Sequence, residues 1–193
     1  MEKLFKLLSD AQASLFVLFH KTWAYHWNVV GEDFPQLHTL FGGQYETMFE
    51  EIDRISEHMR FLNVKPLNSL ERVLEVSKVK TGQSTTDCHK MVKDLLKSNQ
   101  DLCDLLTEVA EEADEQKSRA TSNLADDLNE THGKFVWMLR SYLESSPGLK
   151  EEVDLEESVI NADGEEVGEE CVDCGCYPCV CEPSIETEET TED

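Results

Sequence analysis

The chain has 193 residues and a formal charge of −24, with 41 acidic residues against 17 Lys and Arg. This excess of acid opposes direct binding to DNA, because duplex binding depends on Lys and Arg that neutralise phosphates, and no 18-residue apolar run predicts a membrane span. The first residues, MEKLFKLLSD, continue into an amphipathic pattern rather than a signal peptide, so we expect a cytoplasmic protein. In that reducing compartment its seven cysteines are thiols or metal ligands rather than disulfides.

The acidic residues are concentrated at the C-terminal end. From Pro147 onward the chain holds 17 Asp and Glu against one Lys, a charge of −16, whereas residues 1–146 carry −8. A segment so charged and so poor in large apolar residues cannot bury enough surface to offset the entropy of ordering it. We therefore predict one folded domain over residues 1–146 and a disordered acidic tail over residues 147–193.

The first half of the predicted domain shows two long blocks of apolar residues at helical spacing. We expect one helix from Glu2 to about Val30, where Gly31 and the residues after it break the pattern. Pro35 suits the first turn of a second helix, since its fixed φ and missing N–H are tolerated there. This second helix is expected to continue to about Asn63.

The second half shows a short amphipathic piece over residues 68–76 and then two more long blocks. The polar residues 84–87 are the expected cap of the third long helix. The fourth follows the polar break EEADEQKS, and no strand alternation interrupts the pattern. Four long helices with a short one between the second and third form a bundle, so the predicted fold class is all-α.

Two histidines flank the predicted break between the first two helices. His26 and His38 are twelve residues apart, with GEDFP between them. On one unbroken helix they would point about 120° apart, but on two antiparallel helices each lies within about two turns of the connecting loop. We therefore expect the two imidazoles to lie near each other.

Two carboxylates follow on the second helix. Asp53 and Glu57 are spaced i, i+4 and share one face. Asp53 points to the same general side as His38, but the fifteen residues between them correspond to about 22 Å along the helix axis. One subunit therefore cannot bring both to a single metal ion.

A second subunit can supply the missing half of such a site. If the second helices of two chains pack antiparallel about a two-fold axis, the His end of one meets the Asp/Glu end of the other, and the dimer has two equivalent sites. Two imidazoles and two carboxylates form a mixed nitrogen and oxygen set that suits iron, zinc or manganese. A redox-active ion such as Fe(II) is the preferred interpretation, and the ligand types alone leave zinc open.

The motifs resemble those of one known family. The segments HWNVVG, FPQLH, EEIDRISEH and KFVWMLRSYL are similar, in order and in length, to the Dps-type mini-ferritins (DNA-binding proteins from starved cells) over residues 1–146. The resemblance implies a ferritin-like four-helix bundle with a short helix between helices two and three, assembled as a hollow dodecamer. It also implies oxidation of Fe(II), usually by hydrogen peroxide, at sites shared across two-fold interfaces, with ferric iron stored inside.

The resemblance also assigns roles to individual residues. The catalytic iron ligands that it implies are His26, His38, Asp53 and Glu57. Trp27 matches the tryptophan that the family keeps beside its iron. The family usually has an acid four residues after the second histidine, where this chain has Gly42. The conventional ferritin motif, Glu-x-x-His within one bundle, does not occur in the sequence.

Five of the seven cysteines lie close together in the segment CVDCGCYPCVC of the tail. They are Cys171, Cys174, Cys176, Cys179 and Cys181. Cys-x-x-Cys spacing is typical of tetrahedral thiolate sites, and four thiolates suit Zn(II) or an iron–sulfur centre. Ordinary zinc ribbons, however, separate their pairs by a dozen or more residues. Two interpretations stay open: a compact site for zinc or another thiophilic metal, and a disordered tail with reactive thiols.

The sequence thus supports two functional hypotheses. The leading one is a cytoplasmic ferroxidase and iron-storage oligomer that uses hydrogen peroxide or oxygen and protects against oxidative damage. The alternative is an oligomeric scaffold or metal carrier with weak or no ferroxidase activity, acting through the Cys-rich tail. The remaining histidines are interpreted as surface or packing residues, namely His20, His58, His89 and His132. Cys88 and Cys103 are interpreted as ordinary buried or half-buried thiols.

Overall fold

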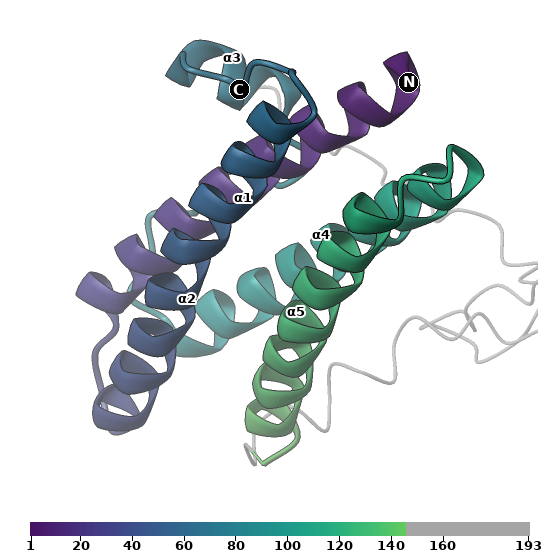
Figure 1. Cartoon of the computed structure of the whole chain (residues 1–193). Coiled ribbons are helices and arrows are strands. Elements are labelled where there is room, and N and C mark those ends of the chain that lie inside the picture. Colours follow the sequence, from purple (N-terminus) through teal and green to yellow (C-terminus); the bar gives the residue numbers. More distant parts are fainter. Residues whose placement is uncertain (146–193) are drawn as a thin grey trace, which may run out of the picture. The chain divides into compact units, whose positions relative to one another are not determined.

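The computed structural model describes residues 1–145, which contain five helices and no strand (Figure 1). The helices are α1 (Glu2–Asn28), α2 (Phe34–Phe61), α3 (Leu70–Val76), α4 (Cys88–Glu115) and α5 (Arg119–Ser145). Four long helices and one short helix were predicted in this order, and the all-α class is confirmed. The tail predicted for residues 147–193, with its five cysteines, lies outside the described residues. No helix within residues 1–145 has the length and apolar character needed to cross a membrane.

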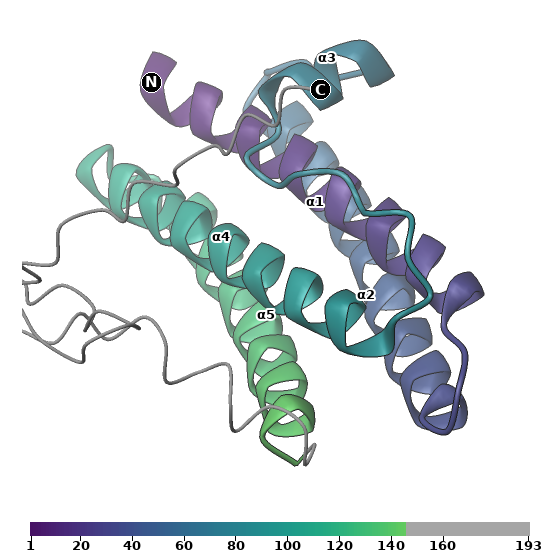
Figure 2. The same cartoon turned by 180° about the vertical axis from the view of Figure 1, so that it is seen from behind.

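The long helices pack as two antiparallel pairs. α1 lies along α2, and α4 lies along α5, as both views show (Figures 1 and 2). α1 also packs on α4, and the short α3 packs on α1. A long connection from α3 runs back beside α1 to the start of α4 (Figure 2). The α1–α2 turn and the far end of α5 therefore lie at the same end of the bundle.

Local signals explain where these helices begin and end. Pro35 occupies the first turn of α2. Gly31 has a φ of 101°, which side-chain-bearing residues rarely adopt, and this lets the chain reverse between α1 and α2. The carboxylate of Asp87 caps α4 by accepting a hydrogen bond from the Lys90 N–H at 3.1 Å. The predicted breaks between the helices are therefore confirmed, and each lies within a few residues of its expected position.

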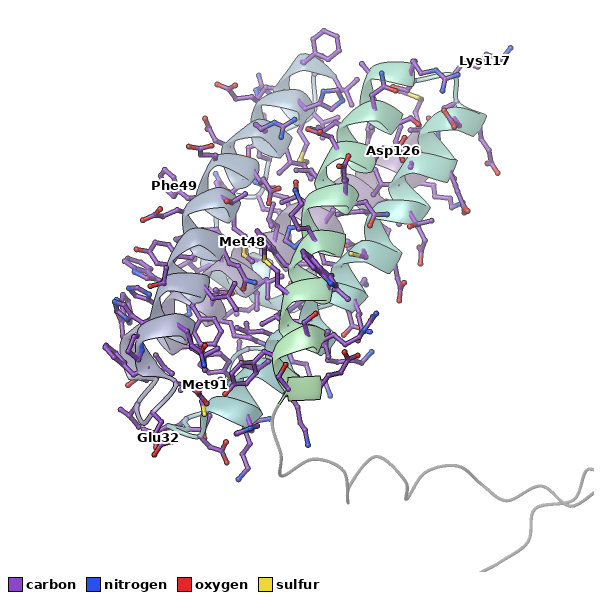
Figure 3. The ribbon with its side chains drawn as sticks, turned by 90° about the horizontal axis from the view of Figure 1, so that it is seen from below. Glu32, Met48, Phe49, Met91, Lys117 and Asp126 are labelled. Carbon is purple, nitrogen blue, oxygen red and sulfur yellow. The ribbon has the colours of Figure 1, made fainter. Side chains whose placement is uncertain are left out.

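The core is formed by the apolar stripes of the four long helices. Along α2 the stripe is clear, because Met48 is fully buried whereas its neighbour Phe49 is exposed. Figure 3 shows Met48 directed between the helices and Phe49 directed away from them. Other fully buried large side chains are Leu4, Leu8, Leu15, Leu18, Leu37, Phe41, Ile55, Met59 and Met91. Burial of these side chains stabilises the fold by about 1.5–3 kcal/mol each.

Charged side chains are also buried among the helices, and Lys21 is the most buried of the lysines within residues 1–145. The Lys21 ammonium of α1 is 1% exposed and donates to Asp94 Oδ1 and to Ser98 Oγ of α4, both at 2.8 Å. The Tyr25 hydroxyl donates to the other oxygen of Asp94 at 2.5 Å and accepts from the Gln83 N–H at 2.9 Å. Burial, together with the bond to Asp94, raises the pKa of Tyr25. This network ties α1 to α4 and to the loop before α4.

The Lys21–Asp94 pair provides a test of what holds the two helix pairs together. Asp94→Ala is expected to lower the free energy of unfolding by about 3–5 kcal/mol, because it leaves a buried ammonium without its counter-ion. The matched control is Asp101→Ala, which breaks a 2.5 Å pair with the largely exposed Lys97 on the same helix and is expected to have a much smaller effect, because water screens an exposed pair. Urea unfolding followed by circular dichroism, at one protein concentration, compares them. Equal effects would contradict the assigned role of Asp94.

Candidate metal centre

His26 and His38 stack on each other across the α1–α2 turn. Their ring centroids are 3.7 Å apart and their planes differ by 20°. Nδ1 of His26 lies 2.8 Å from the carbonyl oxygen of His38, and Nδ1 of His38 lies 2.9 Å from the carbonyl oxygen of His26. A carbonyl oxygen only accepts hydrogen bonds, so each Nδ1 carries the hydrogen and donates it. In each neutral ring the lone pair is therefore on Nε2.

This tautomer is the one that a metal-binding imidazole needs. Metal-ligating histidines usually donate their second ring N–H to a carbonyl or carboxylate, which sets the tautomer and orients the ring. Here the two bonds are reciprocal, so each histidine's backbone orients the other's side chain. The predicted proximity of the imidazoles is confirmed, and their role as ligands stays a prediction.

Aromatic rings and a glycine enclose the stacked imidazoles. The ring of Tyr45 meets His26 edge-on, with the ring centroids 5.2 Å apart, and the ring centroid of Phe34 lies 4.9 Å from that of His38. A Cβ added at Gly42 would lie 3.4 Å from Cε1 of His26, an ordinary contact distance. A side chain at this position would therefore touch the imidazole. The place where the resemblance implies an acid is next to the histidines, and in this chain it carries no carboxylate.

Asp53 and Glu57 lie elsewhere on the same helix. Both side chains are exposed on α2, and the unbroken α2 separates Asp53 from His38 by about 22 Å along its axis. Within residues 1–145 no group of three or more His, Cys, Asp or Glu side chains is arranged to hold a metal ion. A single chain thus brings the two histidines together but does not bring the carboxylates to them.

An aromatic stripe lies on α1 and α2 beside the histidine pair. It consists of Phe16, Phe19, Trp23, Trp27, Tyr45 and Phe49. The ring centroids of Trp23 and Trp27 are 4.5 Å apart, and those of Phe19 and Phe49 are 6.1 Å apart. Trp27 and Phe49 are 56% and 66% exposed. Exposed aromatic surface of this extent is typical of a protein–protein contact, and Phe49 lies between His38 and Asp53 along α2.

Two other histidines have partners that the sequence did not reveal. Nε2 of His58 lies 2.9 Å from Thr121 Oγ1, and burial lowers the pKa of His58. His132 is fully buried and lies within hydrogen-bonding distance of Asn99 and Glu51. These partners come from other helices, so no local spacing could have indicated them.

Comparison with known proteins agrees with this architecture. A model of the ferritin-like domain matches residues 5–148. An uncharacterized low temperature-induced protein of Nostoc sp. is 34% identical over 143 residues, which cover 73% of this chain and 80% of the relative. The DNA protection during starvation protein of Helicobacter pylori is 30% identical over 142 residues, covering 73% of this chain and 99% of the relative.

A solved structure supports the same assignment. The Dps structure from Thermosynechococcus elongatus has a TM-score of 0.73 at 27% identity, and the match covers 77% of this chain and 95% of that one. The fold is therefore the ferritin-like helical bundle, as predicted. The chain belongs to the ferritin-like family and, within it, to the Dps-type mini-ferritins.

The two cysteines of the described chain are both partly buried, as expected. Burial, with a smaller contribution from the neighbouring Asp104 carboxylate, raises the pKa of Cys103 to about 11. A thiol with a raised pKa is protonated, and so unreactive, at neutral pH.

Cys103 should therefore react slowly and with a shifted pH profile. We expect its alkylation rate by iodoacetamide to rise about tenfold per pH unit through pH 10 and to level off only near pH 11, where the thiolate becomes the main form. Peptide mass spectrometry after timed labelling measures the rate. N-acetylcysteine, whose rate levels off near its own pKa, is the reference. A Cys103 profile that levels off below pH 9 would contradict the raised pKa.

Proposed function

We propose that this protein is an iron-binding mini-ferritin that oxidises Fe(II) at sites shared by two subunits and stores ferric iron in a hollow oligomer. Hydrogen peroxide is the proposed oxidant, with oxygen as the alternative. The observation that carries the proposal is the reciprocal bonding of His26 and His38, which directs both Nε2 lone pairs away from the backbone carbonyls. The proposed iron ligands are His26 and His38 of one subunit with Asp53 and Glu57 of its two-fold mate.

The spacing along α2 supports a two-fold contact through this helix. In an antiparallel α2–α2 pair, an axis crossing α2 between about residues 45 and 48 brings His38 level with the partner's stretch from Asp53 to Glu57. Tyr45 and Phe49 of the aromatic stripe flank that crossing point. The exposed rings would therefore be covered by the same contact that completes the metal centre. We propose that such dimers assemble into a dodecamer.

The ligand set suits the proposed chemistry. Neutral imidazole nitrogens and carboxylate oxygens bind Fe(II), and the two negative charges favour the more highly charged Fe(III) product. Two Fe(II) ions give up one electron each, and one hydrogen peroxide accepts both electrons, with two protons, to form two waters. Peroxide and Fe(II) are consumed together, so less of either is left to generate hydroxyl radicals. Gly42 offers no carboxylate beside His26, which leaves a second iron position with fewer protein ligands.

The charge of the protein argues against direct DNA binding as part of this function. A net charge of −24 makes the approach of a phosphate backbone unfavourable. Relatives that carry DNA protection in their names are compatible with this proposal, because removing Fe(II) and peroxide protects DNA without contact. We place this function in the cytoplasm.

The alternative function remains a scaffold or metal carrier with weak ferroxidase activity. Gly42 is the observation that favours it, because the position next to His26 lacks a carboxylate. Metal binding would then depend on the thiolates of Cys171, Cys174, Cys176, Cys179 and Cys181, with zinc as the expected ion. These cysteines lie outside the described residues.

Iron oxidation separates the two functions. Anaerobic Fe(II) addition to the assembled protein, followed by stoichiometric peroxide, should raise ferric absorbance faster than in buffer, and His38→Ala should reduce the rate to that of buffer. His20→Ala is the matched control, because His20 is an exposed histidine on α1 away from the pair and its loss should leave the rate unchanged. Oxidation by the unmodified protein at the buffer rate would exclude the ferroxidase and favour the carrier.

Mixed oligomers test whether the centre is shared. His38→Ala and Asp53→Asn chains are each expected to be inactive alone. If they are unfolded together and reassembled at equal amounts, half of the dimers pair one variant with the other, and each such dimer has one intact centre and one doubly impaired centre. About one quarter of the original activity should therefore return. Inactivity of the reassembled mixture, with assembly confirmed by size-exclusion chromatography, would contradict a centre shared by His38 of one subunit and Asp53 of the other.

A further inference from the structure

A second group of metal-ligating side chains lies in the interior of the bundle. His132 of α5, Glu51 of α2 and Asn99 of α4 are 0%, 2% and 0% exposed. Nδ1 of His132 lies 2.7 Å from Asn99 Oδ1, and its Nε2 lies 3.2 Å from Glu51 Oε2. Glu51 is thirteen residues from His38 along α2, about 20 Å, so this group is separate from the histidine pair.

The hydrogen bonds determine the role of each atom in this group. The Asn99 Nδ2 donates to the Leu95 carbonyl at 2.7 Å, so its Oδ1 faces His132 and accepts from Nδ1–H. Nε2 then faces a carboxylate oxygen, and one proton is shared between them. Their separation of 3.2 Å is long for a charge-assisted hydrogen bond, which is normally about 2.7–2.9 Å.

The same separation suits two ligands of one metal ion. Imidazole nitrogen and carboxylate oxygen bind first-row divalent ions at about 2.0–2.2 Å, which places neighbouring ligand atoms about 2.9–3.4 Å apart. An amide or carbonyl oxygen that accepts from the other ring nitrogen is the usual means of orienting a ligating imidazole. Glu51, His132 and Asn99 already have this arrangement.

Unpartnered polar atoms support a bound ligand here. Glu51 Oε1 has no hydrogen-bond partner, and neither amide atom of Gln44 has one, although Gln44 is 1% exposed. Gln44 lies two turns before Glu51 on the same stripe of α2, about 10.5 Å along the axis. Each buried polar atom without a partner costs about 1–3 kcal/mol. A cation would take up the free oxygen of Glu51, and a water bound to that cation would donate to the amide oxygen of Gln44.

We propose that Glu51 and His132 bind one divalent transition-metal ion inside each bundle, with Asn99 as the residue that positions the imidazole. Water completes the coordination shell and bridges toward Gln44. Binding replaces the proton shared by Nε2 and Oε2, so one proton is released for each ion bound. The imidazole and carboxylate donors suit Mn(II), Fe(II), Co(II) or Zn(II), and no thiolate is needed. The proposal does not depend on ferroxidase activity at the subunit interface.

Co(II) counting tests the interior site without interference from the interface. The parent protein is the full chain with His26→Ala and His38→Ala, and it is dialysed against Co(II) with and without Glu51→Gln. We expect the parent to bind one more Co(II) per chain than the Glu51→Gln variant, while any ions held by the tail are common to both. The matched control, Glu50→Gln, changes the exposed acid next along α2 and should bind as many ions as the parent. Equal binding by parent and Glu51→Gln would overturn the proposal.

A second measurement needs no change at Glu51 and remains valid if that variant fails to fold. When EDTA is added to the Co(II)-loaded parent, ions on exposed ligands should leave at once, whereas the ion at the fully buried His132 should leave only as the bundle opens. We expect one slowly released Co(II) per chain, and its visible absorbance is used to monitor the release. Complete release in a single fast step would show that the group is a hydrogen-bonded part of the core and no metal site.

Discussion

The reciprocal hydrogen bonds between His26 and His38 set the register of the α1–α2 pair. Gly31 reverses the chain, and each histidine then bonds to the backbone of the other. Once these two residues lie opposite each other, the antiparallel geometry determines which residues of α1 and α2 meet further along. Phe19 then contacts Phe49, and Gln12 donates a hydrogen bond to Ser56. A one-residue slip would rotate the helix faces by about 100° and separate both the imidazoles and the aromatic stripe. The candidate ligands and the candidate interface thus depend on the same turn.

This register also explains why one chain alone does not bring the four candidate ligands together. α2 is one continuous helix, so its histidine end and its acidic end remain apart by about 22 Å. The surface between them carries the exposed ring of Phe49 of the aromatic stripe, together with exposed acids such as Glu50. A chain that exposes half of a ligand set at each end of one helix, with apolar surface between, is suited to pairing with a second copy. In this protein, the pairing of two chains and the completion of the candidate ligand set would therefore depend on the same surface of α2.

Local sequence signals predicted the helices and the histidine pair because each depends on near neighbours. Pro35 in a first turn, Asp87 as a cap and a short loop between two periodic segments act within a few residues. The interior group was missed because His132 meets Asn99 and Glu51 across 33 and 81 residues of chain. Its sequence signal was weak: polar residues at positions where the helical stripe would otherwise be apolar. The contact of Gly42 with His26 likewise needed the packing of two helices.

The charge distribution then determines which ligands can reach these sites. Residues 1–146 carry −8 and the remainder −16, so the net field of the protein favours the approach of cations. At physiological salt that field decays over about 8 Å, and exposed carboxylates alone hold divalent ions weakly. At the proposed sites, selectivity would come from nitrogen donors held in a defined tautomer, and the hydrogen bonds assign Nδ1–H both at the stacked pair and at His132. The acidic surface would raise the local concentration of metal ions, and the oriented imidazoles would bind some of these ions in preference to others.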